Sequence, residues 1–181
     1  MPAPRPITPT DEENPLNDLT HFSDSGRARI VDISEKRITV RVATAGGILR
    51  MQPATLARIR ANTIAKGNVL AVADVAAVMA AKQTPSIIPM CHAVSLSGVE
   101  IAFDDVSDAG AENCPGIRVA ATVTSIGQTG VEMEALCAAN VALLTIYDMC
   151  KAIDRGMRIE SVELLEKRGG KSGSWKRSDA A

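Results

Sequence analysis

The sequence predicts a single α+β domain in which helices cover an antiparallel sheet. Stretches that alternate apolar and polar residues outnumber the gaps that could hold crossover helices, which disfavours a Rossmann-type parallel order. The 181 residues are the length of one domain with tails, and a 46% hydrophobic content suffices for a core. Because aromatic residues make up only 2%, that core must consist of Ala, Val, Ile, Leu and Met, which suits close packing of helices on a sheet.

The first elements follow from alternation and from helix-start residues. Alternation predicts short strands at 28–33 and 38–42, separated by a polar turn, and Gly46-Gly47 predicts a bend or bulge after them. Pro53 suits the first turn of a helix over 54–62, and Asn68 is placed to cap a second helix over 69–82.

The second half alternates strand and helix signals. Two prolines predict a rigid loop over 84–90, and strands follow at 94–103 and 117–126 around a surface loop at 104–116. The longest apolar helical pattern covers 131–154, and a last strand is predicted at 158–165.

Composition sets the domain limits. Five prolines and an acidic run predict that residues 1–17 form a disordered tail, which leaves 18–166 as one catalytic α+β domain. Residues 167–181 form a basic, Gly-rich tail. Its cations either donate to phosphates at the site or are simply solvated, and the sequence supports both interpretations equally.

Charge and cysteine usage exclude several classes. Twenty basic and 21 acidic residues give a formal charge of −1, which argues against broad binding to nucleic acid or to a membrane surface. No segment approaches the ~20 apolar residues of a membrane span, and the N-terminus lacks the apolar run of a signal peptide. Four cysteines without CxxC spacing indicate reduced thiols, and the adjacent Cys91 and His92 make a poor metal site. We therefore expect a cytoplasmic protein without a metal centre.

The apolar helix contains charged residues that suggest a site. Asp148 and Lys151 lie one helical turn apart, and Glu134 lies ~40° short of four full turns from Asp148, so all three share a side of the helix. Apolar neighbours on nearly every side predict that the pair is buried. The alternative is an ordinary surface ion pair, which the same spacing also produces.

Three further motifs are weaker. GGKSG at 169–173 is not a P-loop, because Leu165 stands where the motif needs Gly. Lys66 precedes a predicted helix N-terminus, where an anion can bind, and His92 lies at a loop-to-strand junction. A histidine at such a junction is structural about as often as it is functional.

Six segments occur in a characteristic order: KGNV, AAKQT, IIPMCH, TGVEMEAL, LTIYDMCKA and GGKSG. Together they resemble the signature segments of the molybdenum cofactor biosynthesis protein C family, the cyclic pyranopterin monophosphate synthases. The resemblance covers about residues 19–175, and TGVEMEAL followed by TIYDMCKA is highly specific.

The resemblance implies a ferredoxin-like α+β subunit in a hexamer of three dimers, with active sites at dimer interfaces. It implies conversion of 3′,8-cyclo-7,8-dihydro-GTP to cyclic pyranopterin monophosphate with release of pyrophosphate, a lyase-type reaction. By the same resemblance Asp148 and Lys151 form the catalytic acid/base pair. The implied substrate-binding residues are Arg41, Lys66, Met90, Cys91, His92, Met133, Glu134 and Lys167.

The residue types suit that reaction. Ring rearrangement needs proton transfers, which we expect from a partly desolvated Lys151 with a lowered pKa, positioned by Asp148. Expulsion of pyrophosphate needs cations, for which Lys66, His92 and the tail lysines are candidates. No cofactor is required by the sequence, and Mg²⁺ is possible at the triphosphate without a carboxylate cluster of its own.

Three positions depart from the family pattern. Asn68 stands where Asp is usual, Ala93 where Pro follows the histidine, and Gln128 where a basic residue precedes TGVEME. Loss of a positive charge near the triphosphate would weaken binding. The alternative to an enzyme is therefore a non-catalytic nucleotide-binding or assembly paralogue of the same fold.

Overall fold

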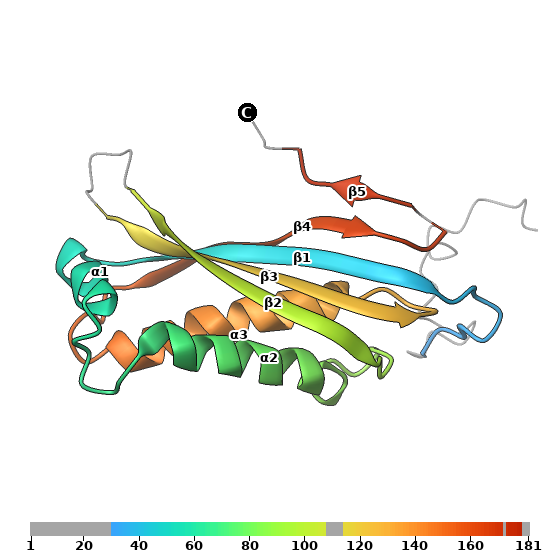
Figure 1. Cartoon of the computed structure of the whole chain (residues 1–181), viewed down its shortest axis with the longest axis horizontal. Helices are drawn as coiled ribbons and strands as arrows, with labels where there is room; N and C mark the ends of the chain where they lie inside the picture. Colours follow the sequence, from blue (N-terminus) through green and yellow to red (C-terminus); the bar gives the residue numbers. More distant parts are fainter. Residues whose placement is uncertain (1–29, 108–113, 172, 179–181) are drawn as a thin grey trace, which may run out of the picture. The chain divides into compact units, whose positions relative to one another are not determined.

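The computed structural model describes residues 30–107, 114–171 and 173–178. In chain order its elements are β1 (Thr39–Arg50), α1 (Pro53–Arg60), α2 (Val69–Ile87), β2 (Leu96–Val106), β3 (Gly116–Gly127), α3 (Glu132–Cys150), β4 (Arg158–Arg168) and β5 (Trp175–Lys176). The five strands form one sheet in the order β2-β3-β1-β4-β5, and every neighbouring pair is antiparallel (Figure 1). The predicted α+β class is confirmed, and the order of the first four strands is ferredoxin-like.

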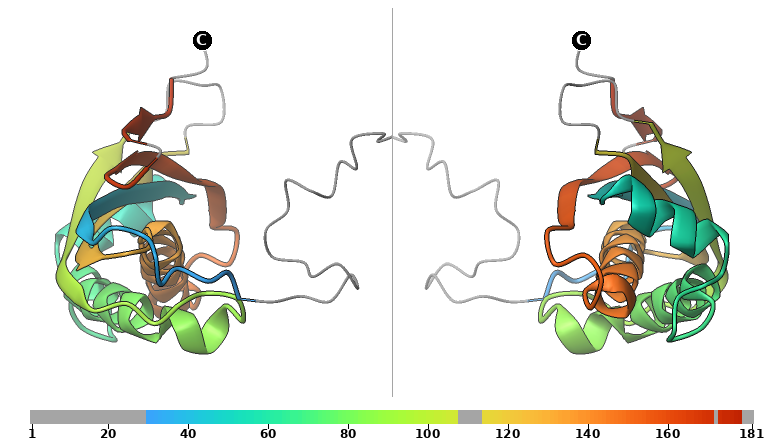
Figure 2. Two further views of the ribbon diagram at one scale, coloured as in Figure 1. Left: turned by 90° about the vertical axis from the view of Figure 1, so that its right-hand side faces the viewer. Right: turned by 90° about the vertical axis from the view of Figure 1, so that its left-hand side faces the viewer.

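The two long helices, α2 and α3, form a layer on one face of the sheet (Figure 1). Figure 2 shows α2 and α3 side by side beneath the strands. Four alanines on α3 have no exposed surface and let its backbone lie close to the sheet: Ala135, Ala138, Ala139 and Ala142. By length and composition alone α3 would pass for a membrane span, but here it is the central core helix. The predicted core of small and aliphatic residues is confirmed.

Both helix-start predictions are confirmed. Pro53 is the first residue of α1, and the Asn68 side chain accepts a hydrogen bond from the backbone N–H of Ala71 at 3.1 Å. The predicted loop over 84–90 is wrong in its first half, because α2 continues to Ile87 with Pro85 in its last turn. Ile88 N–H still donates to the Thr84 carbonyl at 2.9 Å, so the proline interrupts the helix only where it is already ending.

β1 is a single long strand with a bulge. The predicted strand at 38–42 is its beginning, whereas residues 30–33 form no strand, and 28 and 29 lie outside the described residues. The register of β1 against β4 shifts twice, between Thr44 and Ala45 and between Gly46 and Ile48, which confirms the predicted bulge. A Cβ on Gly46 would lie 2.7 Å from the carbonyl oxygen of Val119, so the strands pass too closely for any side chain.

The ends of the elements differ from the sequence-based bounds. β2 and β3 both extend into the predicted loop at 104–116, of which residues 108–113 lie outside the described part. β4 extends two residues beyond 166, and β5 pairs with it, so part of the predicted tail belongs to the sheet. The predicted N-terminal tail, 1–17, also lies outside the described residues.

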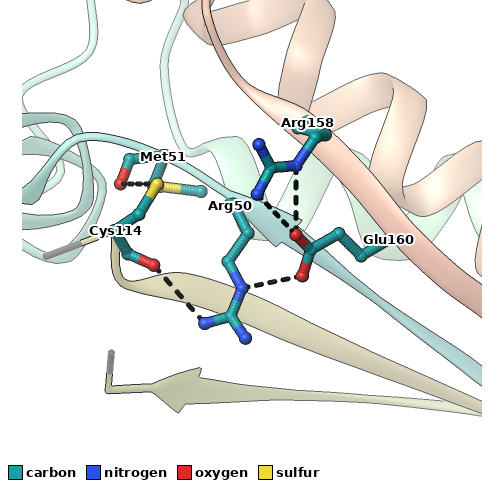
Figure 3. A network of polar contacts seen from close by, with 5 residues as sticks. All are labelled: Arg50, Met51, Cys114, Arg158 and Glu160. Carbon is teal, nitrogen blue, oxygen red and sulfur yellow. Dashed lines mark hydrogen bonds and ion pairs between the residues drawn. The ribbon is translucent and has the colours of Figure 1, made fainter. Parts of the chain in front are cut away.

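An ion-pair network ties together one end of the sheet (Figure 3). Arg50 Nε lies 2.9 Å from Glu160 Oε2, and Arg158 Nη2 lies 2.8 Å from Glu160 Oε1. Arg50 also donates to the carbonyl of Cys114, whose thiol donates to the carbonyl of Met51. These contacts join the end of β1, the start of β4 and the segment that leads into β3.

Candidate active site

Three charged side chains meet at the C-terminal end of α3. Lys66 Nζ donates to Asp148 Oδ2 at 2.9 Å and to the Asp148 carbonyl oxygen at 2.8 Å. Lys151 Nζ lies 2.6 Å from Asp148 Oδ1. The packing of α2 against α3 brings Lys66, which precedes α2, to the end of α3. The Asp148 carboxylate therefore lies between two ammonium groups.

The electrostatics of this cluster differ from the prediction. Hydrogen bonds from Lys151 and then Lys66 lower the pKa of Asp148 to about 2, and the hydrogen bond to Asp148 raises the pKa of Lys151. The side chains of Asp148 and Lys151 are 56% and 54% exposed, so the predictions of a buried pair and of a lysine with a lowered pKa are both wrong for the single chain. α3 is covered by the sheet and by α2 but not on the side that carries the pair.

Glu134 and Cys91 form a separate contact near the start of α3. Glu134 is 1% exposed, and the Cys91 thiol lies 3.6 Å from Glu134 Oε1, while Oε2 has no hydrogen-bond partner in the described chain. Burial raises the pKa of Glu134 and raises that of Cys91 to about 11, so the thiol stays protonated. Met90 and His92 flank Cys91 in the connection between α2 and β2, and Met133 is partly exposed.

The expectation that Glu134 and Asp148 line one site is wrong within one chain. Glu134 is buried, whereas Asp148 is exposed. They are fourteen residues apart on α3, or roughly 21 Å at ~1.5 Å per residue. A shared side of the helix did not mean a shared site, because the rise along the axis separates them.

A cavity of about 1050 Å³ lies at the N-terminal end of α3. Three segments line it: the turn before β1 with the first residues of that strand, the β3–α3 connection, and the end of β4 with the turn after it. Its basic side chains outnumber its two carboxylates, those of Glu35 and Glu132. The basic residues are Lys36, Arg37, Arg41, Lys167, Arg168 and Lys171. Such an excess of cations in a concave site favours an anionic ligand.

Two predicted residues, Arg41 and Lys167, lie in this cavity. Lys167 Nζ is 2.9 Å from Glu132 Oε1, and Arg41 Nε donates to the Gly127 carbonyl at 3.2 Å. Gly170 has φ of +75°, and a Cβ there would collide with the Arg41 guanidinium. Gly170 of GGKSG therefore makes room for Arg41, and Gly169 makes room for the Val40 carbonyl, so neither forms a P-loop phosphate site.

Lys36 and Arg37 were not predicted as site residues. Residues 34–37 suggested only a polar turn, although two adjacent basic residues just before a strand are a signal for an anion site. Glu132 lies in the first turn of α3, and the sequence alone indicates no partner for it. Its partner Lys167 is 35 residues away, so no local pattern connects them.

One chain does not unite the predicted site residues. Lys66, Asp148 and Lys151 lie at one end of α3, whereas Arg41, Cys91, Glu134 and Lys167 lie at the other. Glu132 and Asp148 are sixteen residues apart, roughly 24 Å along the helix axis. The predicted acid/base pair therefore lies at one end of α3, and most of the predicted substrate-binding residues lie at the other.

Comparison with known proteins identifies the family. The MoaC family model matches residues 30–170, which include both ends of α3. The chain belongs to the MoaC family. The predicted resemblance is confirmed, and the assigned positions from Arg41 to Lys167 all lie within the matched MoaC segment.

Three relatives of this MoaC chain are each named cyclic pyranopterin monophosphate synthase. The Limosilactobacillus fermentum protein is 57% identical over 162 residues, which cover 90% of this chain and 94% of the relative. The Desulfitobacterium hafniense protein is 55% identical over 163 residues, with 90% and 96% covered. The Listeria monocytogenes protein is 51% identical over 160 residues, with 88% and 96% covered.

Proposed function

We propose that this chain is a cyclic pyranopterin monophosphate synthase of molybdenum cofactor biosynthesis. It converts 3′,8-cyclo-7,8-dihydro-GTP to cyclic pyranopterin monophosphate and releases pyrophosphate, as a lyase-type enzyme. The observation that carries the proposal is Asp148 between Lys66 and Lys151, in a chain 51–57% identical to three proteins named for this activity.

The cluster suits proton transfer. Because Asp148 raises the pKa of Lys151, the lysine is an ammonium at neutral pH in the chain by itself. It therefore acts as a general acid toward the pterin ring, and Asp148 holds it in place. Use of Lys151 as a base requires burial of the pair, because loss of water lowers the pKa of a lysine.

The cavity suits the triphosphate. Its basic residues balance the charge that develops on pyrophosphate as the cyclic phosphate closes. The described residues contain no group of three or more His, Cys, Asp or Glu side chains that would hold a resident metal ion. We therefore propose that Mg²⁺, where it takes part, arrives on the substrate phosphates.

The site is completed between copies of the chain in this proposal. The Asp148–Lys151 end of one subunit faces the Arg41–Lys167 cavity of another, in a homo-oligomer that we take to be a hexamer of three dimers. Exposed apolar side chains beside the charged cluster, Leu144 at 54% and Ile153 at 42%, support an interface there. We place the enzyme in the cytoplasm, consistent with four cysteines that form no disulfide.

The deciding experiment is direct. Pure protein is incubated with 3′,8-cyclo-7,8-dihydro-GTP, and cyclic pyranopterin monophosphate and pyrophosphate are both quantified. Equal amounts of the two products are expected. Tight binding of the substrate without either product would instead support the non-catalytic paralogue.

A further inference from the structure

The turn before β1 is held by the side chain of Gln128, the residue that follows β3. Residues Ile33 to Lys36 form a tight turn, in which Lys36 N–H donates to the Ile33 carbonyl at 2.9 Å. Gln128 Nε2 donates to two carbonyls of this turn, that of Ser34 at 2.9 Å and that of Lys36 at 3.0 Å. One amide group thus ties together segments more than ninety residues apart in the chain.

Arg41 strengthens the same connection. Its Nη2 donates to the Gln128 carbonyl at 3.2 Å and to the Arg37 carbonyl at 3.5 Å, and its Nε donates to the Gly127 carbonyl. The Arg41 guanidinium is therefore partly occupied by backbone carbonyls. Gln128 and Arg41 together fix the turn against the β3–α3 connection.

The turn that Gln128 and Arg41 hold contributes two basic side chains to the cavity. Lys36 and Arg37 both line the cavity of about 1050 Å³, as do Gln128 and Arg41. Lys36 and Arg37 are long side chains on a short turn, so their reach toward a ligand depends on where the turn backbone lies. A turn held before the ligand arrives loses less conformational freedom on binding.

We infer that Gln128 is a positioning residue, whose amide holds the 34–37 turn so that Lys36 and Arg37 bind the polyphosphate group of the substrate. This inference rests on the proposed function for the identity of the ligand. A neutral amide is well suited to the position, because its N–H₂ group carries two donors and meets two carbonyls. A carboxylate there would face both carbonyls without any donor.

The test is binding of inorganic triphosphate, measured by calorimetry on the intact protein. Gln128→Met keeps the length and the neutral charge of the side chain but removes both donors. We expect Kd for triphosphate to rise roughly tenfold, as loss of one to two ordinary hydrogen bonds implies. Gln83→Met, the same change on the exposed face of α2, is the control and should leave Kd unchanged.

A double-mutant cycle separates positioning from general loosening of the fold. In a chain that already carries Lys36→Ala and Arg37→Ala, Gln128→Met should have little further effect on Kd, because the turn then carries no cation to position. With the cyclised GTP substrate, Gln128→Met should raise KM and leave kcat within about twofold. Additive effects, or an unchanged Kd in the single variant, would overturn the inference.

Hydrogen exchange keeps the idea testable if Gln128→Met is too unstable for calorimetry. Gln128→Ala is then used, and protection at residues 34–37 should fall while that of α2 stays unchanged. Unchanged protection of the turn would also overturn the inference. If triphosphate binding follows these expectations but the wild-type protein forms no pterin product, the proposed function fails and the role of Gln128 stands.

Discussion

Lys66 donates to Asp148 across 82 residues of sequence, at 2.9 Å to the carboxylate and 2.8 Å to the backbone carbonyl. This contact places Lys66 in the charged cluster of Asp148 and Lys151, so the role that we propose for it is not only that of a phosphate ligand. It also divides the Asp148 charge between two lysines, since Lys151 binds the other carboxylate oxygen.

The first prediction concerns the titration of Asp148. Its pKa of about 2 should rise in Lys66→Met, but stay below its ordinary value, because Lys151 remains its stronger partner. A carboxyl with a lowered pKa stabilises the fold above its unfolded pKa of about 4, and that contribution disappears as the pH falls through about 2. NMR of the carboxyl carbon checks this, and an unchanged pKa would show that Lys66 does not pair with Asp148 in solution.

The second prediction concerns turnover. Lys151→Ala should lower kcat on the order of a hundredfold or more with the substrate still bound, because it removes the proposed proton donor. Asp148→Asn should have a similar effect, since it keeps the shape but not the charge. An exposed pair without a catalytic role would leave turnover nearly normal in both variants.

The third prediction tests whether the site is shared between subunits. Lys151→Ala and Lys167→Ala alter opposite ends of α3 and should each be inactive alone. When the two are co-expressed, about a quarter of the sites should be active, because half of randomly formed pairs are mixed and each mixed pair rebuilds one of its two sites. Absence of recovery in isolated mixed oligomers would mean that each site is built from one chain.

The fourth prediction concerns Glu134, whose pKa is raised by burial. A raised carboxyl pKa favours the fold below the unfolded pKa, and this contribution is lost as the pH rises through the folded value. Tm of the wild-type protein should therefore fall relative to Glu134→Gln as the pH rises above the ordinary carboxyl pKa of about 4. Glu100→Gln, at an exposed position on β2, is the control, and a constant difference in Tm for Glu134→Gln would refute the raised pKa.

The fifth prediction concerns the start of α1. Asp154 is 3% exposed and accepts from Gln52 N–H at 2.9 Å and from the Thr55 hydroxyl at 3.1 Å, which replaces the side-chain cap that Gln52 does not provide. Asp154→Ala should cost about 1–3 kcal/mol, because it leaves two donors unsatisfied, and should lower Tm by several degrees. Asp74→Ala, on the exposed side of α2, should have little effect.

Local chemistry explains what the sequence predicted well. Pro53 and Asn68 mark the starts of their helices by their own conformation and side chain, and Gly46-Gly47 marks the bulge because no Cβ fits there. The strand predicted at 28–33 had suitable alternation, but its described residues pair with no other strand. Alternation makes a strand possible, whereas pairing decides whether it forms.

The site was harder to predict for reasons of geometry. The spacing of Asp148 and Lys151 correctly placed them together, but apolar neighbours in sequence did not reveal which side of α3 stays uncovered. The pairing of Lys66 with Asp148 and of Glu132 with Lys167 could not be predicted without knowing which segments meet in space. All the assignments of residues to the substrate, including those of Met90, His92 and Met133, remain predictions.

α3 also sets the distance between two charged groups, the Asp148–Lys151 pair at its C-terminal end and the Glu132–Lys167 pair at its N-terminal end. Insertion of one residue in its middle would lengthen it by ~1.5 Å and rotate one end by ~100° relative to the other, so the two groups would no longer face their partners together. In a shared-site assembly that error would recur at every subunit contact. In the proposed assembly the length of this helix would therefore be fixed by every subunit contact, and deletions or insertions within it should be tolerated far less than in the segment between β2 and β3.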